Sequence, residues 1–311
     1  MKRLVSTAMV AILVAIFAIT GFAQKERSKE DLLKEIATLS NSSNADDKEK
    51  GYQTAKEFLA RFGTDKSDNV KKVRKFVESY RTSMFFKAVD GNKFQSTFTL
   101  GKEILADEPQ NVDILINLTY AGYNAMAAGD KSYLDDTISS AKKAEELIEA
   151  GTLPKSFAPF KDKTEALAWT YYIEGTLVTT RDKKAGAVSI YKATLLESPI
   201  KENALPYNMI ALYYEDEYNK LGNALKAKLA SKPVNEAEAS ALEERVKQAL
   251  DLMLDAYARS SKKADAENAA NKDALKSRLA QVYKFVKKTD EGLSEYVSYI
   301  TKTPLPDPSK F

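Results

Sequence analysis

Apolar side chains recur about every three to four residues along most of the chain, which is the spacing of one face of an α-helix. The clearest case runs from Val73 to Ala88 and stops at the Gly91-Asn92 pair, a turn signal. Similar segments follow, each ended by a glycine, a proline or a polar turn, and no stretch shows the alternation typical of strands. The pattern therefore predicts an all-α protein.

The segment from Trp169 to Pro199 carries the most regular pattern. It predicts two amphipathic helices joined by a short polar turn, and Pro199 ends the pair because proline lacks an amide proton and crowds the preceding turn. Gly122 and Gly175 fall inside predicted helices, where glycine costs about 1 kcal/mol relative to alanine. We expect such glycines to let a neighbouring helix approach closely.

Gly175, Ala187, Tyr191 and Pro199 stand at positions that resemble the tetratricopeptide repeat, a helix-turn-helix of ~34 residues. The resemblance covers roughly residues 70–214 and is degenerate outside this unit. It implies a tetratricopeptide-like α-solenoid of stacked antiparallel helical hairpins, ended by a C-terminal capping helical pair. Another helical repeat or a helical bundle would produce much of the same pattern.

Five regions are expected from these patterns. The dense charge after the N-terminus and the three prolines near the C-terminus set the outer boundaries, since an extended proline-rich end is expected to be mobile. The predicted regions are a signal peptide (1–23), a charged N-terminal segment and linker (24–50), the helical repeat region (51–231), a C-terminal helical cap (232–301) and a Pro-rich flexible tail (302–311).

The first residues have the pattern of an export signal. Lys2 and Arg3 form a basic start, residues 8–19 an apolar core, and Gly21-Phe22-Ala23 a small-x-small cleavage site. We expect a mature chain that begins near Gln24 and is periplasmic or secreted. The alternative is an uncleaved membrane anchor, because residues 4–23 approach the ~20 residues that a membrane-spanning helix needs.

Composition argues against several classes of function. The chain has no cysteine and no histidine, which removes disulfides, lipid attachment, the commonest general base and the commonest metal ligands. No phosphate-binding glycine loop is present, so we expect no enzyme, no cofactor and no metal. Without Lys2 and Arg3, 45 basic residues face 44 acidic ones, and a net charge near +1 predicts no nucleic-acid partner.

Carboxylates, lysines and tyrosines are the chemistry that remains for catalysis. The pairs Asp135-Asp136 and Glu145-Glu146 are predicted to lie on solvated helix faces. An enzyme acting on envelope polysaccharide would need two such carboxylates on opposite sides of a cleft. That function is kept as an alternative that depends on the tertiary structure.

The resemblance implies a ligand groove lined by the first helix of each hairpin. With Gly122, Gly175 and Ala211 as alignment points, the candidate partner-binding residues are Thr119, Tyr123, Trp169, Tyr172, Thr176, Asn208 and Leu212. Trp169, Tyr172 and Thr176 share one helical face through spacings of three and four. The alternative is that Trp169 packs against a neighbouring helix. The lysine and asparagine clamp that this family uses for a C-terminal carboxylate is missing.

These observations predict a non-catalytic, extracytoplasmic module that binds a protein or peptide in a helical groove. Contact with a membrane is expected only if the N-terminal segment stays attached. Two other non-catalytic functions are compatible with the sequence: a structural or self-assembling envelope scaffold, and a small-molecule binder in a closed superhelix.

Overall fold

The computed structural model describes residues 27–233 and 235–311. In these two ranges the regular elements are thirteen α-helices and one short 3₁₀ helix, so the predicted all-α class is confirmed. The predicted signal peptide, residues 1–23, and the expected mature start at Gln24 lie outside the described residues. None of the helices described is both long and apolar enough to span a bilayer.

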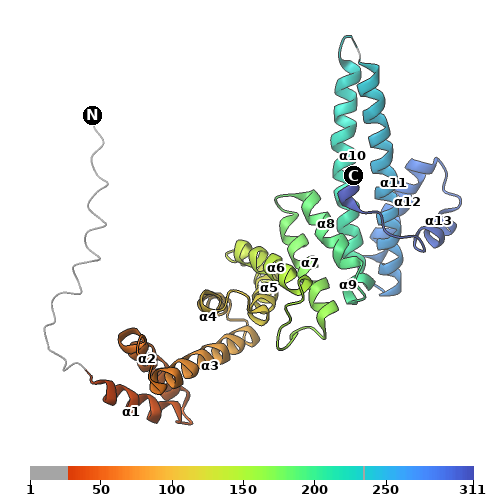
Figure 1. The fold of residues 1–311 in the computed structure, drawn as a ribbon. Helices are drawn as coiled ribbons and strands as arrows, with labels where there is room; N and C mark the ends of the chain where they lie inside the picture. The colour runs from red at the N-terminus through yellow and green to blue at the C-terminus, as the bar shows by residue number, and fades with distance from the viewer. Residues whose placement is uncertain (1–26, 234) are drawn as a thin grey trace, which may run out of the picture. The chain divides into compact units, whose positions relative to one another are not determined.

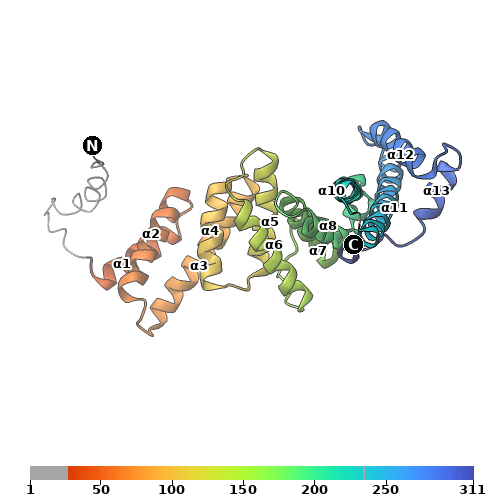
Figure 2. The ribbon, with the colours of Figure 1, turned by 90° about the horizontal axis from the view of Figure 1, so that it is seen from above.

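The chain divides into two compact units, residues 1–83 and 84–311, which are described separately. The first unit contains α1 (Lys29–Ser40), α2 (Ala45–Phe62) and the start of α3 (Asp68–Asp90). α1 packs against α2 (Figure 2), and the two helices begin at polar caps, Ser28 and Asn44, whose side chains accept backbone N–H groups.

The core of the first unit joins all three helices. Leu32 of α1 and Phe58 of α2 are fully buried, and Val73 of α3 packs in the same cluster. The predicted charged segment and linker, residues 24–50, is therefore mostly helix in its described part. Its linker is only the short turn at residues 41–44 between α1 and α2.

The second unit begins with a run of helices in which each packs against the next along the chain, and α5 also contacts α7 (Figures 1 and 2). Asn111, Asp162 and Asp182 cap α5, α7 and α8, because each side chain accepts a backbone N–H from the first turn. These helices are α4 (Phe94–Asp107), α5 (Val112–Ala127), α6 (Leu134–Glu149), α7 (Lys163–Val178) and α8 (Lys183–Thr194).

Glycines set the closest approaches between these helices. A Cβ added at Gly175 of α7 would lie 2.7 Å from the carbonyl oxygen of Gly186 in α8. A Cβ at Gly122 of α5 would lie 2.7 Å from the Cβ of Thr137 in α6. Side chains cannot occupy these positions without moving the partner helix, so the prediction that such glycines permit close helix packing is confirmed.

A long antiparallel hairpin, α10 (Ala204–Ala230) and α11 (Glu236–Ala266), extends beyond the other helices of its unit (Figure 1). α12 (Lys272–Lys287) and α13 (Leu293–Ile300) pack against α11, and the one-turn α9 (Pro199–Glu202) precedes α10. The predicted boundary between residues 231 and 232 falls in the turn at the tip of this hairpin.

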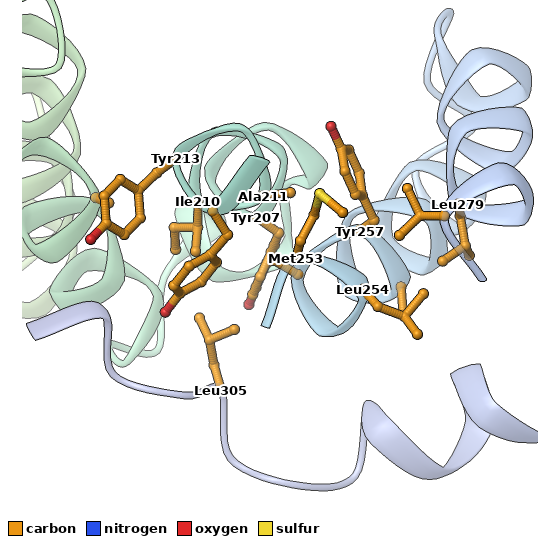
Figure 3. Close-up of a cluster of buried hydrophobic side chains, with 14 of the residues drawn as sticks. Tyr207, Ile210, Ala211, Tyr213, Met253, Leu254, Tyr257, Leu279 and Leu305 are labelled. Atoms are coloured by element: carbon orange, nitrogen blue, oxygen red, sulfur yellow. The ribbon is translucent and has the colours of Figure 1, made fainter. Parts of the chain in front are cut away.

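The two helices of the hairpin share one core, drawn in Figure 3. Tyr207 and Ile210 of α10 lie in the same buried cluster as Met253 and Leu254 of α11. Apolar faces of both helices are thus removed from water together. The predicted cap, residues 232–301, shares this core with α10, which belongs to the predicted repeat region.

The C-terminal tail, residues 302–311, is packed on this core and contains η1 (Pro308–Lys310). Leu305 is 8% exposed and reaches the cluster in Figure 3, and the ring of Phe311 lies 5.7 Å from that of Tyr214. Arg259 also donates a hydrogen bond to the carbonyl oxygen of Ile300 at 2.8 Å. The tail was predicted to be flexible. In the structure it is held on the core by two of its apolar side chains, Leu305 and Phe311.

Candidate functional site

Three of the predicted partner-binding residues meet in an aromatic cluster between α5 and α7. The ring centroid of Tyr123 lies 6.2 Å from that of Trp169 and 6.3 Å from that of Tyr172. Trp169 and Tyr172 are themselves 5.8 Å apart, nearly perpendicular. Contacts of this geometry add about 0.5–1.5 kcal/mol beyond the area they bury.

The loop before α7 covers much of this cluster. Phe160 stacks on Trp169 at 6.0 Å with an interplanar angle of 16°. Tyr172 is only 4% exposed, and burial raises the pKa of its phenol. Trp169 is half-buried. The contacts therefore favour packing as the main role of Tyr172, and Trp169 keeps part of its surface exposed.

Two threonines of the predicted set use their hydroxyls inside their own helices. Thr119 is fully buried and donates to the carbonyl oxygen of Leu115 at 2.9 Å, so it does not face a groove. Thr176 is half-buried and donates to the carbonyl oxygen of Tyr172 at 2.7 Å. Its hydroxyl also lies 3.9 Å from the sulfur of Met209, which links α7 to α10.

An exposed apolar stripe follows on α10. Leu205 is 45% exposed and Leu212 is 51% exposed, with the half-buried Met209 between them. Spacings of four and three place these side chains on one helical face. Asn208 is half-buried next to Met209. Of the predicted residues, Leu212 is thus the one most open to a partner.

Three hollows surround the middle of α10 and share lining residues. The first, of about 410 Å³, has an apolar floor of Met209, Leu212 and Tyr213. The second, of about 300 Å³, contains Tyr218, Leu250 and Phe285 and shares Glu215 and Asn219 with the first. The third, of about 410 Å³, is polar and shares Thr179, Lys183 and Asp216 with the first. We call the apolar stripe and these hollows the α10 surface.

Neighbouring cations lower the pKa of two acidic groups of the α10 surface, Asp216 and Glu215. Lys183 at 2.6 Å and Lys220 at 2.8 Å lower the pKa of Asp216. Burial opposes the ionisation of Glu215, but hydrogen bonds from Arg278 and Tyr257, each at 2.6 Å, outweigh it and lower that pKa. The rim of the surface therefore carries fixed charges of both signs.

The carboxylate pair at Glu145 and Glu146 differs from the prediction of a solvated face. Glu146 is exposed, but Glu145 is 8% exposed and packs between α6 and its neighbours. Burial and the nearby carboxylate of Glu174 raise the pKa of Glu145 to about 9. The sequence pattern already indicated that Glu145 is buried, since it lies on the same helical face as the buried Ala141 and Ile148.

The fold brings the carboxylates of Glu145 and Glu174 together. An enzyme that hydrolyses polysaccharide would also need a pair of carboxylates. Both lie within the helix packing, at 8% and 9% exposure, and Glu174 accepts a hydrogen bond from Ser189. Neither lines a hollow of the α10 surface. A glycosidase needs its substrate between the two carboxylates, whereas the side chains of Glu145 and Glu174 are both buried.

Sequence reasoning missed most of the α10 surface. Glu215 of α10 and Phe285 of α12 line the same hollow, although their spacing in the chain gives no sign that they meet. Within residues 27–233 and 235–311, no group of three acidic side chains is arranged to hold a metal ion. No protein-family model matches the chain, and neither a curated protein nor a solved structure matches it.

Proposed function

We propose that this protein is a non-catalytic, exported binding module that receives an apolar segment of another polypeptide on the α10 surface. The observation that carries the proposal is the exposed stripe of Leu205, Met209 and Leu212 beside two hollows with apolar floors. Exposed apolar groups that gather beside hollows are typical of protein interaction sites.

The stripe is an exposed apolar surface on which a helix or a strand of a partner could pack. Burial of apolar surface contributes about 25 cal/mol per Å², so covering two largely exposed leucines and the floor at Tyr213 supplies a favourable free energy. Residues spaced by four and three are the arrangement by which an amphipathic helix is recognised. The neighbouring pair of Lys183 and Asp216 would orient the partner, since rim charges act mainly on orientation and association rate.

The tetratricopeptide resemblance extends the proposal to the first helices of successive hairpins, α5, α7 and α10. Contacts from Tyr123 to Tyr172 and from Thr176 to Met209 support a continuous row across these helices. A partner lying along that row would reach Leu212 last. In this arrangement the aromatic cluster holds α5 and α7 together, and the apolar stripe on α10 contacts the partner.

The experiment places a photo-crosslinking amino acid at Leu212 in the protein's own host, with Leu153 as the matched control. Both leucines are exposed, at 51% and 57%, but Leu153 lies in the loop before α7 and outside the α10 surface. We expect a specific polypeptide adduct from position 212 and none from position 153. Leu212→Asp should then weaken binding of that polypeptide at least tenfold, whereas Leu153→Asp should not. Equal adducts, or equal affinities of the two variants, would reject the proposal.

Export is proposed from the basic, apolar and small-residue order of residues 1–23. Mass spectrometry of the protein from its own host provides the check. A mature chain beginning near Gln24 supports export with cleavage. An intact Met1 in the membrane fraction would support the anchored alternative.

Self-assembly is a second candidate function, favoured by the charge on the projecting end of the α10–α11 hairpin. Residues 219–233 carry only basic charges and residues 235–244 only acidic ones. An antiparallel second copy would place the basic helix of one hairpin against the acidic helix of the other, in a closed two-fold contact. The charged residues are Lys220, Lys226, Lys228, Lys232, Glu236, Glu238, Glu243 and Glu244.

Light scattering over a range of protein concentrations tests this second function. The variant Lys226→Glu/Lys232→Glu and the variant Glu243→Lys/Glu244→Lys should each remain monomeric, because like charges then face each other. An equimolar mixture of the two should form a dimer again. A wild-type protein that stays monomeric at high concentration excludes the assembly.

A further inference from the structure

A pocket of about 630 Å³ lies apart from the α10 surface, between α9, the end of α11 and the first residues of the tail. In the described ranges its lining includes four lysines and Arg259 but one carboxylate, Glu202. A volume of this size is in the range of small-molecule sites. The four lysines are Lys201, Lys262, Lys263 and Lys302.

Arg259 builds one wall of the pocket rather than serving as a free cation. Its Nε donates to Asp255 at 2.6 Å, and its guanidinium also donates to the carbonyl oxygens of Ile300 at 2.8 Å and Pro304 at 3.2 Å. Arg259 is 8% exposed, and the buried Asp255 balances its charge. The tail is therefore fixed against α11, and the pocket keeps its shape.

Two of the lysines pair with glutamates that are largely exposed, and one of these glutamates, Glu202, also lines the pocket. Lys201 pairs with Glu197, and Lys263 pairs with Glu202 at 2.6 Å. The side chains of these lysines are 33% and 26% exposed, whereas those of the glutamates are 83% and 68% exposed. Ion pairs with such exposed partners contribute only about 0–1 kcal/mol. An anion inside the pocket can replace both glutamates at little cost.

Other pocket groups favour an anion that has an apolar part. Lys262 donates one hydrogen bond to Thr301 at 2.8 Å, and an ammonium group has three donors. Leu195, 54% exposed, and the buried Leu305 supply apolar surface. The hydroxyl of Tyr207 donates to the carbonyl oxygen of Lys201 at 2.9 Å, which fixes the ring in the wall.

We propose that this pocket binds a small organic phosphate, with the phosphate on Lys201, Lys262 and Lys263 and the organic part against Leu195. Lysine binds phosphate as a point charge, and several lysines around one dianion add their attraction in a partly desolvated site. The site is separate from the α10 surface and does not depend on the binding of a polypeptide there.

Titration calorimetry of the full chain in 150 mM NaCl tests the proposal with phenyl phosphate, inorganic phosphate and phenol as probes. Phenyl phosphate should bind at least tenfold more tightly than either of the others, because it alone has both chemical parts. Lys201→Gln/Lys263→Gln should weaken its binding at least tenfold. The matched control Lys226→Gln/Lys232→Gln, on the projecting hairpin, should bind as the wild type does.

A second variant, which keeps every lysine, tests whether weaker binding of the lysine variant results from misfolding. Leu195→Asp places a negative charge at an exposed position of the pocket and should also weaken phenyl phosphate binding at least tenfold. Leu212→Asp, on the α10 surface, should leave it unchanged. The proposal is wrong if phenyl phosphate does not bind, if inorganic phosphate binds equally well, or if the pocket variants bind like the controls.

Discussion

Glu145 shows that the environment of a side chain can change its protonation state. It is buried between helices, and one of its carboxylate oxygens has no hydrogen-bond partner. Desolvation is the main cause of its raised pKa, and Glu174 and Glu149 add to it, while Lys192 and Lys142 oppose it. The side chain therefore carries a proton at neutral pH, so the packing holds a neutral group rather than a charge.

Stability should fall as pH rises through the range set by Glu145. Its pKa in the folded chain is about 9, against 4.5 ordinarily, so between these values the folded state binds more protons than the unfolded state. The stabilising effect is complete below about pH 4.5 and lost by about pH 9. Glu145→Gln removes this dependence and should be more stable than the wild type at pH 8, on the order of 1–2 kcal/mol.

Urea denaturation at pH 5 and pH 8 measures the effect. Glu146→Gln is the matched control, because the Glu146 side chain is exposed and forms an ion pair with Lys143. It should leave the pH dependence unchanged. A wild-type stability that is level between these pH values would show that Glu145 is ionised in the folded chain.

Two glycines within helices should respond in opposite directions to the same substitution. Gly175→Ala places a Cβ 2.7 Å from the carbonyl oxygen of Gly186 and 2.9 Å from the amide nitrogen of Ile190, and these backbone atoms cannot move aside alone. We expect a loss of about 2–3 kcal/mol. Gly222→Ala meets no atom within 4 Å in α10 and should gain about 0.5–1 kcal/mol from helix propensity. Thermal unfolding followed by circular dichroism distinguishes the two.

Among the elements, the tail shows how an extended segment becomes part of a core. Apart from the short 3₁₀ helix η1 it has no regular structure, yet its Leu305 and Phe311 pack on α10 and its neighbours. Arg259 donates hydrogen bonds to the carbonyl oxygen of Ile300, at the end of α13, and to that of Pro304 in the tail. The tail therefore contributes to the stability of the α10–α11 hairpin.

Truncation of Leu305 should measure that contribution. Leu305→Ala removes a side chain that is 8% exposed and should lower the free energy of unfolding by about 2–3 kcal/mol. Lys310→Ala, in the same tail but exposed, should change it by less than about 0.5 kcal/mol. Equal and small effects in urea denaturation would mean that the tail is not docked in solution.

At the scale of the whole molecule, the two units have separate buried clusters. Phe58 belongs to a cluster made only of residues from the first unit, and Phe85 to one made only of residues from the second. Each side chain is fully buried. Regions with separate buried clusters can unfold locally, each with its own free energy of unfolding. Local stability therefore need not be uniform along the chain.

Phe58→Ala and Phe85→Ala should therefore destabilise different regions, by about 3–5 kcal/mol each. Hydrogen exchange of backbone amides resolves this. Exchange in α1 and α2 should accelerate with the first substitution, and exchange in α4 and α5 with the second. Acceleration over both regions by either substitution would show that the units unfold as one.

The local sequence determined the helices, since apolar spacing and end signals act within a few turns. The turn at Gly91-Asn92 and the hairpin from Trp169 to Pro199 follow from such signals. Close helix packing was also predicted correctly at Gly122 and Gly175, although Gly222 shows that a glycine within a helix need not contact a neighbour. Of the candidate partner-binding residues, Tyr123, Trp169 and Tyr172 lie together, while Thr119 is buried.

Only the tertiary structure decided which polar and apolar groups are withdrawn from water. Glu145 is neutral beside Glu174 of α7, Leu305 is buried, and α10 and α11 share one core, and each of these outcomes depends on contacts with other segments. The hollows beside Leu212 and the lysine-lined pocket arise from helices distant in the chain. Helix periodicity is a short-range property, whereas burial and electrostatic environment depend on every segment that packs against a residue.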